Sequence, residues 1–149
     1  LIEPILELMK DSDREIRMMA LLVGASFDDP RCVEPIMSLL DDEDWWTRLS
    51  AVETLGRSGD KRCVGRLIEM LDDQDCQWAV IEALGALGDE QAIRPLARFL
   101  KHEAVPVRLA TIDSLASFED PRVLKALTDR LKHDDSQIVR DRCVEVVRT

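Results

Sequence analysis

Aromatic residues, glycine, proline and histidine are all scarce in this chain. Aromatic residues make up 4% of its 149 residues, and there is no tyrosine. Six glycines and six prolines are too few for a collagen-like or proline-rich linker protein. The apolar runs are only a few residues long, which excludes a membrane-spanning helix. No charged leader followed by an apolar segment opens the chain, so we expect no secretion signal, no membrane partner and a cytoplasmic location.

The chain also has fewer basic than acidic residues. The chain has 30 acidic and 20 basic residues, which gives a formal net charge of −10. This charge disfavours nucleic acid as a ligand, because the phosphate backbone is itself negative. Hydrophobic residues make up 46% of the chain, which is enough to bury a core. We therefore expect a folded, acidic protein that does not bind nucleic acid.

The chain lacks the usual patterns of metal-binding and catalytic residues. Its four cysteines form no CxxC pair, and its two histidines do not flank them at zinc spacing, so we expect no metal and no cofactor. Cys32 and Cys63 fall on neighbouring predicted helices about 8–10 Å apart, too far for a disulfide. Nucleophilic catalysis needs a base beside a serine or cysteine, and His102 and His133 both fall in predicted turns. We expect no enzymatic activity.

An internal repeat dominates the sequence. Apolar residues spaced i, i+3, i+4, i+7, which is one face of an α-helix, recur at offsets of 31, 31, 29 and 31 residues. The five occurrences begin at Ile2, Val33, Val64, Ile93 and Leu124. A second apolar helix follows each one and is marked in turn by Arg17, Arg48, Gln77, Arg108 and Arg140. The sequence thus predicts five helix-turn-helix units over residues 1–29, 30–60, 61–89, 90–120 and 121–149.

The turns between these units carry helix-ending and helix-starting residues. Gly59 and Gly88 fit the left-handed position that ends a helix, and Pro30 and Pro121 fit the first turn of the next one. One unit cannot bury its apolar face alone, whereas stacked neighbours can. We expect one all-α solenoid domain over residues 1–149. Because the first unit begins inside a helix and the last stops before the expected ending, we also expect a fragment of a longer protein.

The units resemble HEAT repeats, above all the short units of phycobilisome-lyase-type proteins. The matching motifs are Ile16-Arg17-x-x-Ala20, Arg48-x-x-Ala51, Val107-Arg108-x-x-Thr111 and Val139-Arg140-x-x-Cys143, with Leu-Gly-x-x-Gly-Asp at residues 55–60 and 84–89. The resemblance covers the whole chain and implies a right-handed α-solenoid. It also implies a protein-binding scaffold, while a minority of such proteins are enzymes or chaperone-like lyase subunits. The alternative function is therefore a subunit of a bilin or tetrapyrrole lyase.

The resemblance also implies a structural ladder, in which the arginine of each unit pairs with an aspartate of a neighbouring unit. The ladder arginines are Arg17, Arg48, Arg108 and Arg140. Asp13 and Asp44 lie four residues before the first two, but Ala104 and Ser136 hold that place before the last two. We therefore expect a ladder that is broken in the last two units. The alternative role for these arginines is an anion site at the start of the second helices.

One outward column of the second helices is acidic. It reads Leu22, Glu53, Glu82, Asp113 and Glu145. In HEAT-type stacks the second helices line the concave face, so the resemblance places these carboxylates as a stripe along a groove. Such a stripe fits the binding of a basic segment of another protein. The alternative is an ordinary solvated surface.

The N-terminal units carry two further candidate contacts. Trp45 and Trp46 are adjacent on a helix start and cannot both face one core, so we expect at least one to be exposed for a cation–π contact. The alternative is that they pack under the loops. Met19, Leu22 and Val23 put apolar side chains in outward columns, as either a contact surface or a face covered by a preceding unit. The sequence thus favours a non-catalytic scaffold that binds a protein through its concave face and its acidic, tryptophan-bearing N-terminal end.

Overall fold

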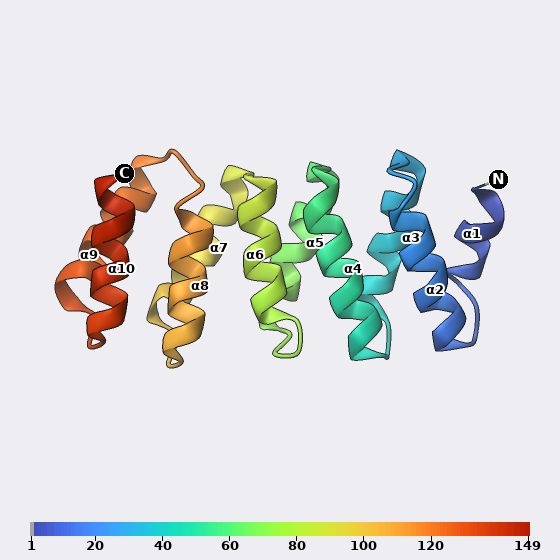
Figure 1. The fold of residues 1–149 in the computed structure, drawn as a ribbon, viewed down its shortest axis with the longest axis horizontal. Helices are drawn as coiled ribbons and strands as arrows, with labels where there is room; N and C mark the ends of the chain where they lie inside the picture. Colours follow the sequence, from blue (N-terminus) through green and yellow to red (C-terminus); the bar gives the residue numbers. More distant parts are fainter. Residues whose placement is uncertain (1) are drawn as a thin grey trace.

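The computed structural model describes residues 2–149, and within them every regular element is a helix. Five helix pairs follow one another in a row, with the two chain ends at opposite ends of the row (Figure 1). The first helices of the pairs are α1 (Glu3–Leu8), α3 (Val33–Ser38), α5 (Val64–Glu69), α7 (Ile93–Ala97) and α9 (Pro121–His133). The second helices are α2 (Arg14–Ala25), α4 (Trp45–Ser58), α6 (Gln77–Leu87), α8 (Val105–Leu115) and α10 (Gln137–Arg148). The second helices form one layer and the first helices form the other (Figure 1).

The first helices are less regular than the repeat predicts. The central three are flanked on both sides by 3-10 turns, namely η1 (Pro30–Cys32), η2 (Leu39–Asp41), η3 (Lys61–Cys63), η4 (Met70–Asp72), η5 (Glu90–Ala92) and η6 (Arg98–Lys101). Asp29, Asp60 and Asp89 start these segments by accepting a hydrogen bond from the backbone N–H two residues ahead. The tighter 3-10 hydrogen bonds occupy backbone groups that a helix end leaves without a partner.

The core is a continuous apolar layer between the two helix layers. From the central first helices and the 3-10 turns that follow them it takes Val33, Ile36, Leu40, Val64, Leu67, Leu71, Ile93, Leu96 and Leu100, all at most 6% exposed. From the second helices it takes Leu21, Val52, Leu55, Ile81, Leu84, Ile112, Leu115 and Val139, all fully buried. These are the periodic apolar positions of the repeat, and they join into one cluster along the row. The predicted all-α solenoid is confirmed, while its right-handed sense stays a prediction.

Two glycines let the second helices approach closely. A Cβ atom on Gly56 would lie 2.7 Å from Ala83 Cβ, and one on Gly85 would lie 2.4 Å from Ser114 Oγ and 2.9 Å from its Cα. The Ser114 hydroxyl donates to the Ile81 carbonyl at 2.7 Å, and the Ser117 hydroxyl donates to the Gly85 carbonyl at 2.9 Å. Hydrogen bonds from side chain to main chain therefore stabilise the α6–α8 contact.

The second helices are anchored to the turns that precede them. In each pair the marker side chain donates to the main-chain carbonyl six residues earlier. The donors are Arg17, Arg48, Gln77, Arg108 and Arg140, and the acceptors are the carbonyls of Asp11, Asp42, Leu71, His102 and Asp134. One recurring contact thus fixes the turn within every pair.

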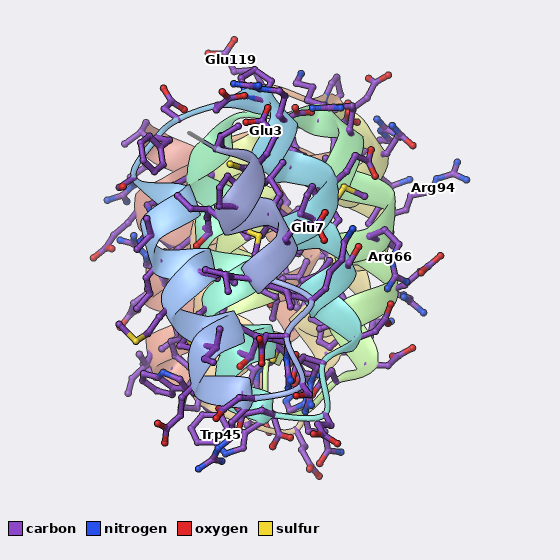
Figure 2. All side chains as sticks on the ribbon, turned by 90° about the vertical axis from the view of Figure 1, so that its right-hand side faces the viewer. Glu3, Glu7, Trp45, Arg66, Arg94 and Glu119 are labelled. Atoms are coloured by element: carbon purple, nitrogen blue, oxygen red, sulfur yellow. The ribbon has the colours of Figure 1, made fainter. Side chains whose placement is uncertain are left out.

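Three of the marker arginines also reach the next pair. Arg17 binds both carboxylate oxygens of Asp42, at 2.6 and 3.0 Å. Arg48 binds Asp73 at 2.9 Å and Asp75 at 3.1 Å. The guanidinium of Arg108 binds Asp135 at 2.7 Å and Asp134, whose side chain is 1% exposed, at 3.1 Å. These contacts form a ladder along the row, at the end of the pairs where the second helices begin. Figure 2 looks along the row from the N-terminal pair, and Trp45, the first residue of α4, marks this end.

Two expectations about the ladder were wrong. Asp13 and Asp44 do not pair with Arg17 and Arg48, because each caps its own helix by accepting backbone N–H bonds. The ladder is also intact between the fourth and fifth pairs, where its most buried ion pair lies. The acceptor is the aspartate at the start of the following turn, about 25 residues after the arginine, rather than the one four residues before it.

The joint between the third and fourth pairs lacks the ion pair. Gln77 stands in place of the arginine, and His102 stands in place of the aspartate. His102 keeps the local role of that aspartate, because its Nδ1 accepts the Ala104 N–H at 3.0 Å as Asp42 Oδ1 accepts the Asp44 N–H. Both partners are thus replaced at the same joint.

A methyl group at Gly85 should destabilise the α6–α8 contact. Because the nearest atoms include the Ser114 backbone, the helices must separate, and we expect Gly85→Ala to cost about 1–3 kcal/mol in urea unfolding. Gly65→Ala is the matched control. A Cβ there meets nothing within 4 Å, so the helix-favouring alanine should stabilise the protein by roughly 0.5–1 kcal/mol. Equal effects of the two substitutions would contradict the close contact.

Removing the guanidinium of Arg108 should be far more costly than removing an exposed one. Arg108→Met leaves the buried Asp134 carboxylate with the longer 3.4 Å contact to Arg130, so we expect a loss of about 3 kcal/mol in unfolding free energy. Arg122→Met is the control, because the Arg122–Asp120 pair is exposed and should contribute under about 1 kcal/mol. A loss below about 1 kcal/mol for Arg108→Met would mean that the ladder does not hold the row together.

The ladder should also set the acid stability of the protein. Burial works to raise the pKa of Asp42, but hydrogen bonds from Arg17 and the Asp44 N–H outweigh it and hold the pKa below its usual value of 3.8. A carboxylate with a lowered pKa stabilises the folded state above its unfolded pKa, and that stability is lost as pH falls through the folded pKa. We expect the unfolding free energy to decrease as the pH is lowered below about 4. The decrease should be smaller in Asp42→Asn, and in the exposed Asp72→Asn it should be the same as in the wild type.

Candidate protein-interaction face

The four predicted carboxylates lie in one continuous row on the second-helix layer. Glu53, Glu82, Asp113 and Glu145 are all exposed, on α4, α6, α8 and α10. The first two line a common groove, and Glu82 and Asp113 line the next one. A single guanidinium, that of Arg142, contacts both Asp113 and Glu145. We call these four residues the acidic stripe.

The grooves beside the stripe have small residues at their base. The groove between α4 and α6 has a volume of about 280 Å³ and includes Gly56, Ala79, Ala83 and Ala86, with Arg57 also in its lining. The groove between α6 and α8 has a volume of about 420 Å³ and is lined by Gly85, Ala110 and Ser114 together with Trp78, Pro106 and Leu109. Both follow from the close helix approach at the two glycines, and each has room for a side chain of a partner.

Trp78 links the wider groove to the acidic stripe. Its indole is 47% exposed, and its Nε1–H donates to Glu82 Oε1 at 2.8 Å. This bond holds the ring beside the carboxylate, so an apolar surface and two negative charges, those of Glu82 and Asp113, line one groove. A ring face next to carboxylates is the environment that a lysine or arginine side chain prefers. Trp78 was not among the site residues predicted from the sequence, although its place four residues before Glu82 on a helix indicates the contact.

The stripe is partly neutralised at its C-terminal end. Arg142 Nε donates to Asp113 at 2.6 Å, and its Nη1 donates to Glu145 at 2.7 Å. Of the four carboxylates, Glu53 and Glu82 have no cation of the described residues at hydrogen-bond distance. The position of Arg142, three residues before Glu145, could have indicated part of this pairing.

Trp45 and Trp46 are both exposed, at 50% and 53%. Their rings meet edge to face with centroids 5.4 Å apart. The alternative that they pack under the loops is therefore wrong. Trp46 lies seven residues before Glu53 on α4, which places the two on the same side of that helix. Trp46 thus lies on the face of the acidic stripe.

The same face turns apolar at α2. Met19, Leu22 and Val23 are 66%, 57% and 44% exposed. Their positions on α2 match those of the stripe region on the later helices, with Leu22 in the column of Glu53 and Glu82. No described residue covers them. The second-helix layer therefore runs from an apolar end at the first pair to a charged centre and C-terminal end.

The cysteine and histidine side chains are the remaining reactive groups of the described residues. Burial raises the pKa of the Cys63 and Cys76 thiols to about 11, which keeps both protonated at neutral pH. His102 caps a turn, and His133 lies beside Asp129 on an exposed helix end. In residues 2–149 no three His, Cys, Asp or Glu side chains are grouped to hold a metal ion. None of the described helices is both long enough and apolar enough to cross a bilayer.

The HEAT-repeat family matches the chain over residues 2–76 and 64–148, which together span nearly all of it. The chain belongs to the HEAT-repeat family. This confirms the resemblance drawn from the four arginine motifs and the two Leu-Gly motifs. A search of curated protein sequences found no match to this HEAT-repeat protein.

Two solved structures show the same fold. One is the complex of CpcE and CpcF of phycocyanin lyase from Nostoc, with a TM-score of 0.70 and 21% identity over 97% of this chain. This chain spans only 62% of that lyase chain. The other is a designed armadillo repeat protein in complex with the peptide (KR)4, with a TM-score of 0.69 and 16% identity. It is covered over 81% of its length, and this chain over 98%. At these identities the likeness concerns the fold alone.

Proposed function

We propose that this HEAT-repeat protein is a non-catalytic interaction module that binds a basic segment of a partner protein across its second-helix layer. The observation that carries the proposal is the acidic stripe with its two grooves, at which Glu82 is shared and Trp78 supplies an aromatic wall. The four free, buried cysteine thiols support a place in the reducing cytoplasm.

The chemistry of the face favours cations over other ligands. Among the described residues no cation is bound to Glu53 or Glu82, so their charge is available to a partner. The Trp78 ring adds a cation–π contact, which increases in strength where water is excluded. Arginine fits the groove best, since a planar guanidinium stacks on a ring while it donates to carboxylates.

The spacing of the stripe suits an extended segment. Neighbouring second helices are expected to lie about 8–10 Å apart, and an extended chain advances about 3.3 Å per residue. A basic residue at every third position would therefore meet successive carboxylates. The designed armadillo neighbour binds (KR)4, so a repeat solenoid of similar fold can take such a peptide. The apolar surface of Met19, Leu22 and Val23 with Trp45 and Trp46 would contact an apolar part of the same partner.

The proposal is tested by calorimetric titration with a synthetic (KR)4 peptide at low and high salt. Each of Glu53→Gln, Glu82→Gln and Asp113→Asn removes one charge contact of about 0.5–1 kcal/mol, so the triple variant should bind about 30-fold more weakly. Trp78→Leu should weaken binding about 5-fold. Glu90→Gln, Glu103→Gln and Glu119→Gln together are the matched control, with the same change in charge away from the stripe.

Equal loss of binding in the stripe variant and the control variant would contradict the proposal, because the net charge of the protein alone would then explain the weaker binding. Failure of the wild-type protein to bind (KR)4 at low salt would contradict it as well. A (KR)4 peptide presents a cation at every position, so no choice of register can cause such a failure.

The second candidate function is a subunit of a bilin or tetrapyrrole lyase. It is favoured by one observation, the match of 97% of the chain to a chain of the phycocyanin lyase complex. A bilin-handling protein should shift the absorption spectrum of added bilin, and a scaffold should not. A spectrum unchanged at protein in excess over bilin would exclude this candidate.

A further inference from the structure

The charge of the outer surface of the first-helix layer changes from negative to positive along the row. Three positions of each first helix, spaced i, i+4 and i+7, lie on one helix side and point away from the second helices. In the first three pairs they hold Glu3, Glu7, Lys10; Glu34, Ser38, Asp41; and Gly65, Glu69, Asp72. In the last two pairs they hold Arg94, Arg98, Lys101; and Lys125, Asp129, Lys132. All of these residues are exposed, and their formal charge sums to −5 in the first set and +4 in the second.

The two sets meet on a continuous surface. Beside the acidic set, Arg66 on α5 binds two of its members, Asp41 of the preceding pair at 2.8 Å and Glu69. At the boundary between the sets, Asp72 lines the same hollow as Arg98 and Lys101. Figure 2 shows Arg66 and Arg94 projecting from the same side of the row. The sign of the surface therefore reverses at the joint between α5 and α7.

The basic set is free of partners within the chain. In residues 2–149, none of the five cations Arg94, Arg98, Lys101, Lys125 and Lys132 makes a hydrogen bond or ion pair. Most other arginines are paired, as in the ladder and in the turn contacts of Arg31, Arg62 and Arg122. The acidic set is partly paired, because Arg66 binds Asp41 and Glu69, and Arg62 lies 3.9 Å from Glu34. The basic set is therefore the half whose charge is most available to a complementary surface.

We propose that two copies of this chain associate through their first-helix layers in antiparallel orientation, with the acidic half of each facing the basic half of the other. A two-fold axis at the α5–α7 joint brings α5 of one copy onto α7 of its partner, and α3 onto α9. The acidic positions of α3 and α5 then meet the predominantly basic positions of α9 and α7. A parallel arrangement would instead set like charges against each other.

The proposed occupant is a second copy because the surface already contains its own complement. A two-fold interface needs one patch that is self-complementary. A surface that is negative on one side of a central line and positive on the other satisfies this condition. Four first helices at about 8–10 Å spacing and about 15–20 Å of contact length would bury roughly 500–800 Å² per copy. This is at the small end for a stable pair, so the association should be weak and sensitive to salt. Gly65 is exposed, and a Cβ atom at its position would meet nothing within 4 Å, so the second copy can approach closely near the axis.

Sedimentation velocity of the full chain tests this at about 100 μM in low and high salt. We expect a monomer–dimer equilibrium in about 50 mM NaCl and a monomer in about 500 mM NaCl, since exposed charge pairs are screened at the higher concentration. The variant R94E/R98E/K101E should be monomeric in both, because α7 then repels α5 of the second copy. The variant E69K/D72K should be monomeric for the converse reason.

Mixing the two monomeric variants is the decisive step. Their α5 and α7 surfaces are complementary again, so an equimolar mixture should recover the dimer fraction of the wild type. Arg57→Glu and Arg148→Glu together are the control, with the same number of charge reversals as E69K/D72K. They reverse unpaired cations on the second helices α4 and α10 and should leave the dimer intact. Circular dichroism confirms that each variant is folded.

A wild type that is monomeric at low salt overturns the proposal, as does a mixture that stays monomeric. Retention of the dimer in R94E/R98E/K101E would equally overturn it. Binding of the (KR)4 peptide uses the opposite layer and should be the same in the R94E/R98E/K101E and E69K/D72K variants. Failure of self-association and failure of the proposed peptide binding are thus distinguished in separate measurements.

Discussion

The hydrogen bond from each marker side chain to the carbonyl six residues earlier is the constraint on which the architecture depends. It closes the turn between the two helices of a pair and sets where the second helix begins. In Arg17, Arg48 and Arg108 the same guanidinium also binds an aspartate of the next pair. A planar guanidinium has five donors in a fixed fork, so it can join a turn and its neighbour at once in a defined geometry. Local geometry and stacking are therefore coupled through single side chains.

This coupling decides what the two outer surfaces of the row can do. Because the second helices start in register, equivalent residues such as Glu53 and Glu82 recur at equivalent places on one layer. The close contacts at Gly56 and Gly85 bring these helices together and leave shallow grooves between them. The first helices are equally regular, so their outward residues also form columns. A repeat fold thus converts the choice of one exposed residue per unit into the charge pattern of a whole surface.

Most of the fold could be predicted from the sequence, because helical periodicity and the spacing of the units are local properties. The turn glycines also behave as predicted, since Gly59 and Gly88 adopt positive φ angles of 69° and 65°. The ladder acceptors were missed because Asp42 and Asp134 are about 25 residues from their arginines, and spacing within one turn pointed to Asp13 and Asp44. The exposure of both Trp45 and Trp46 depends on how α4 starts, which periodicity does not fix.

The candidate site was predicted less completely than the fold. The column of carboxylates follows from repeat alignment, so its position on the second-helix layer could be read from the sequence. Its net charge could not, since Arg142 reaches from α10 of the fifth pair to Asp113 on α8 of the fourth. The role of Trp78 depends on a groove that exists only once α6 and α8 are packed.

The joint at Gln77 and His102 has a consequence for the elasticity of the row. The neighbouring joints are tied by ion pairs between turns, whereas this one is tied near the other end of α6 and α8 by the hydroxyls of Ser114 and Ser117. The ladder pairs are largely buried, so salt screens them little. The central joint has no such tie at the turn end of α6 and α8, so a bend of the row that opens the turn ends would concentrate there at any ionic strength.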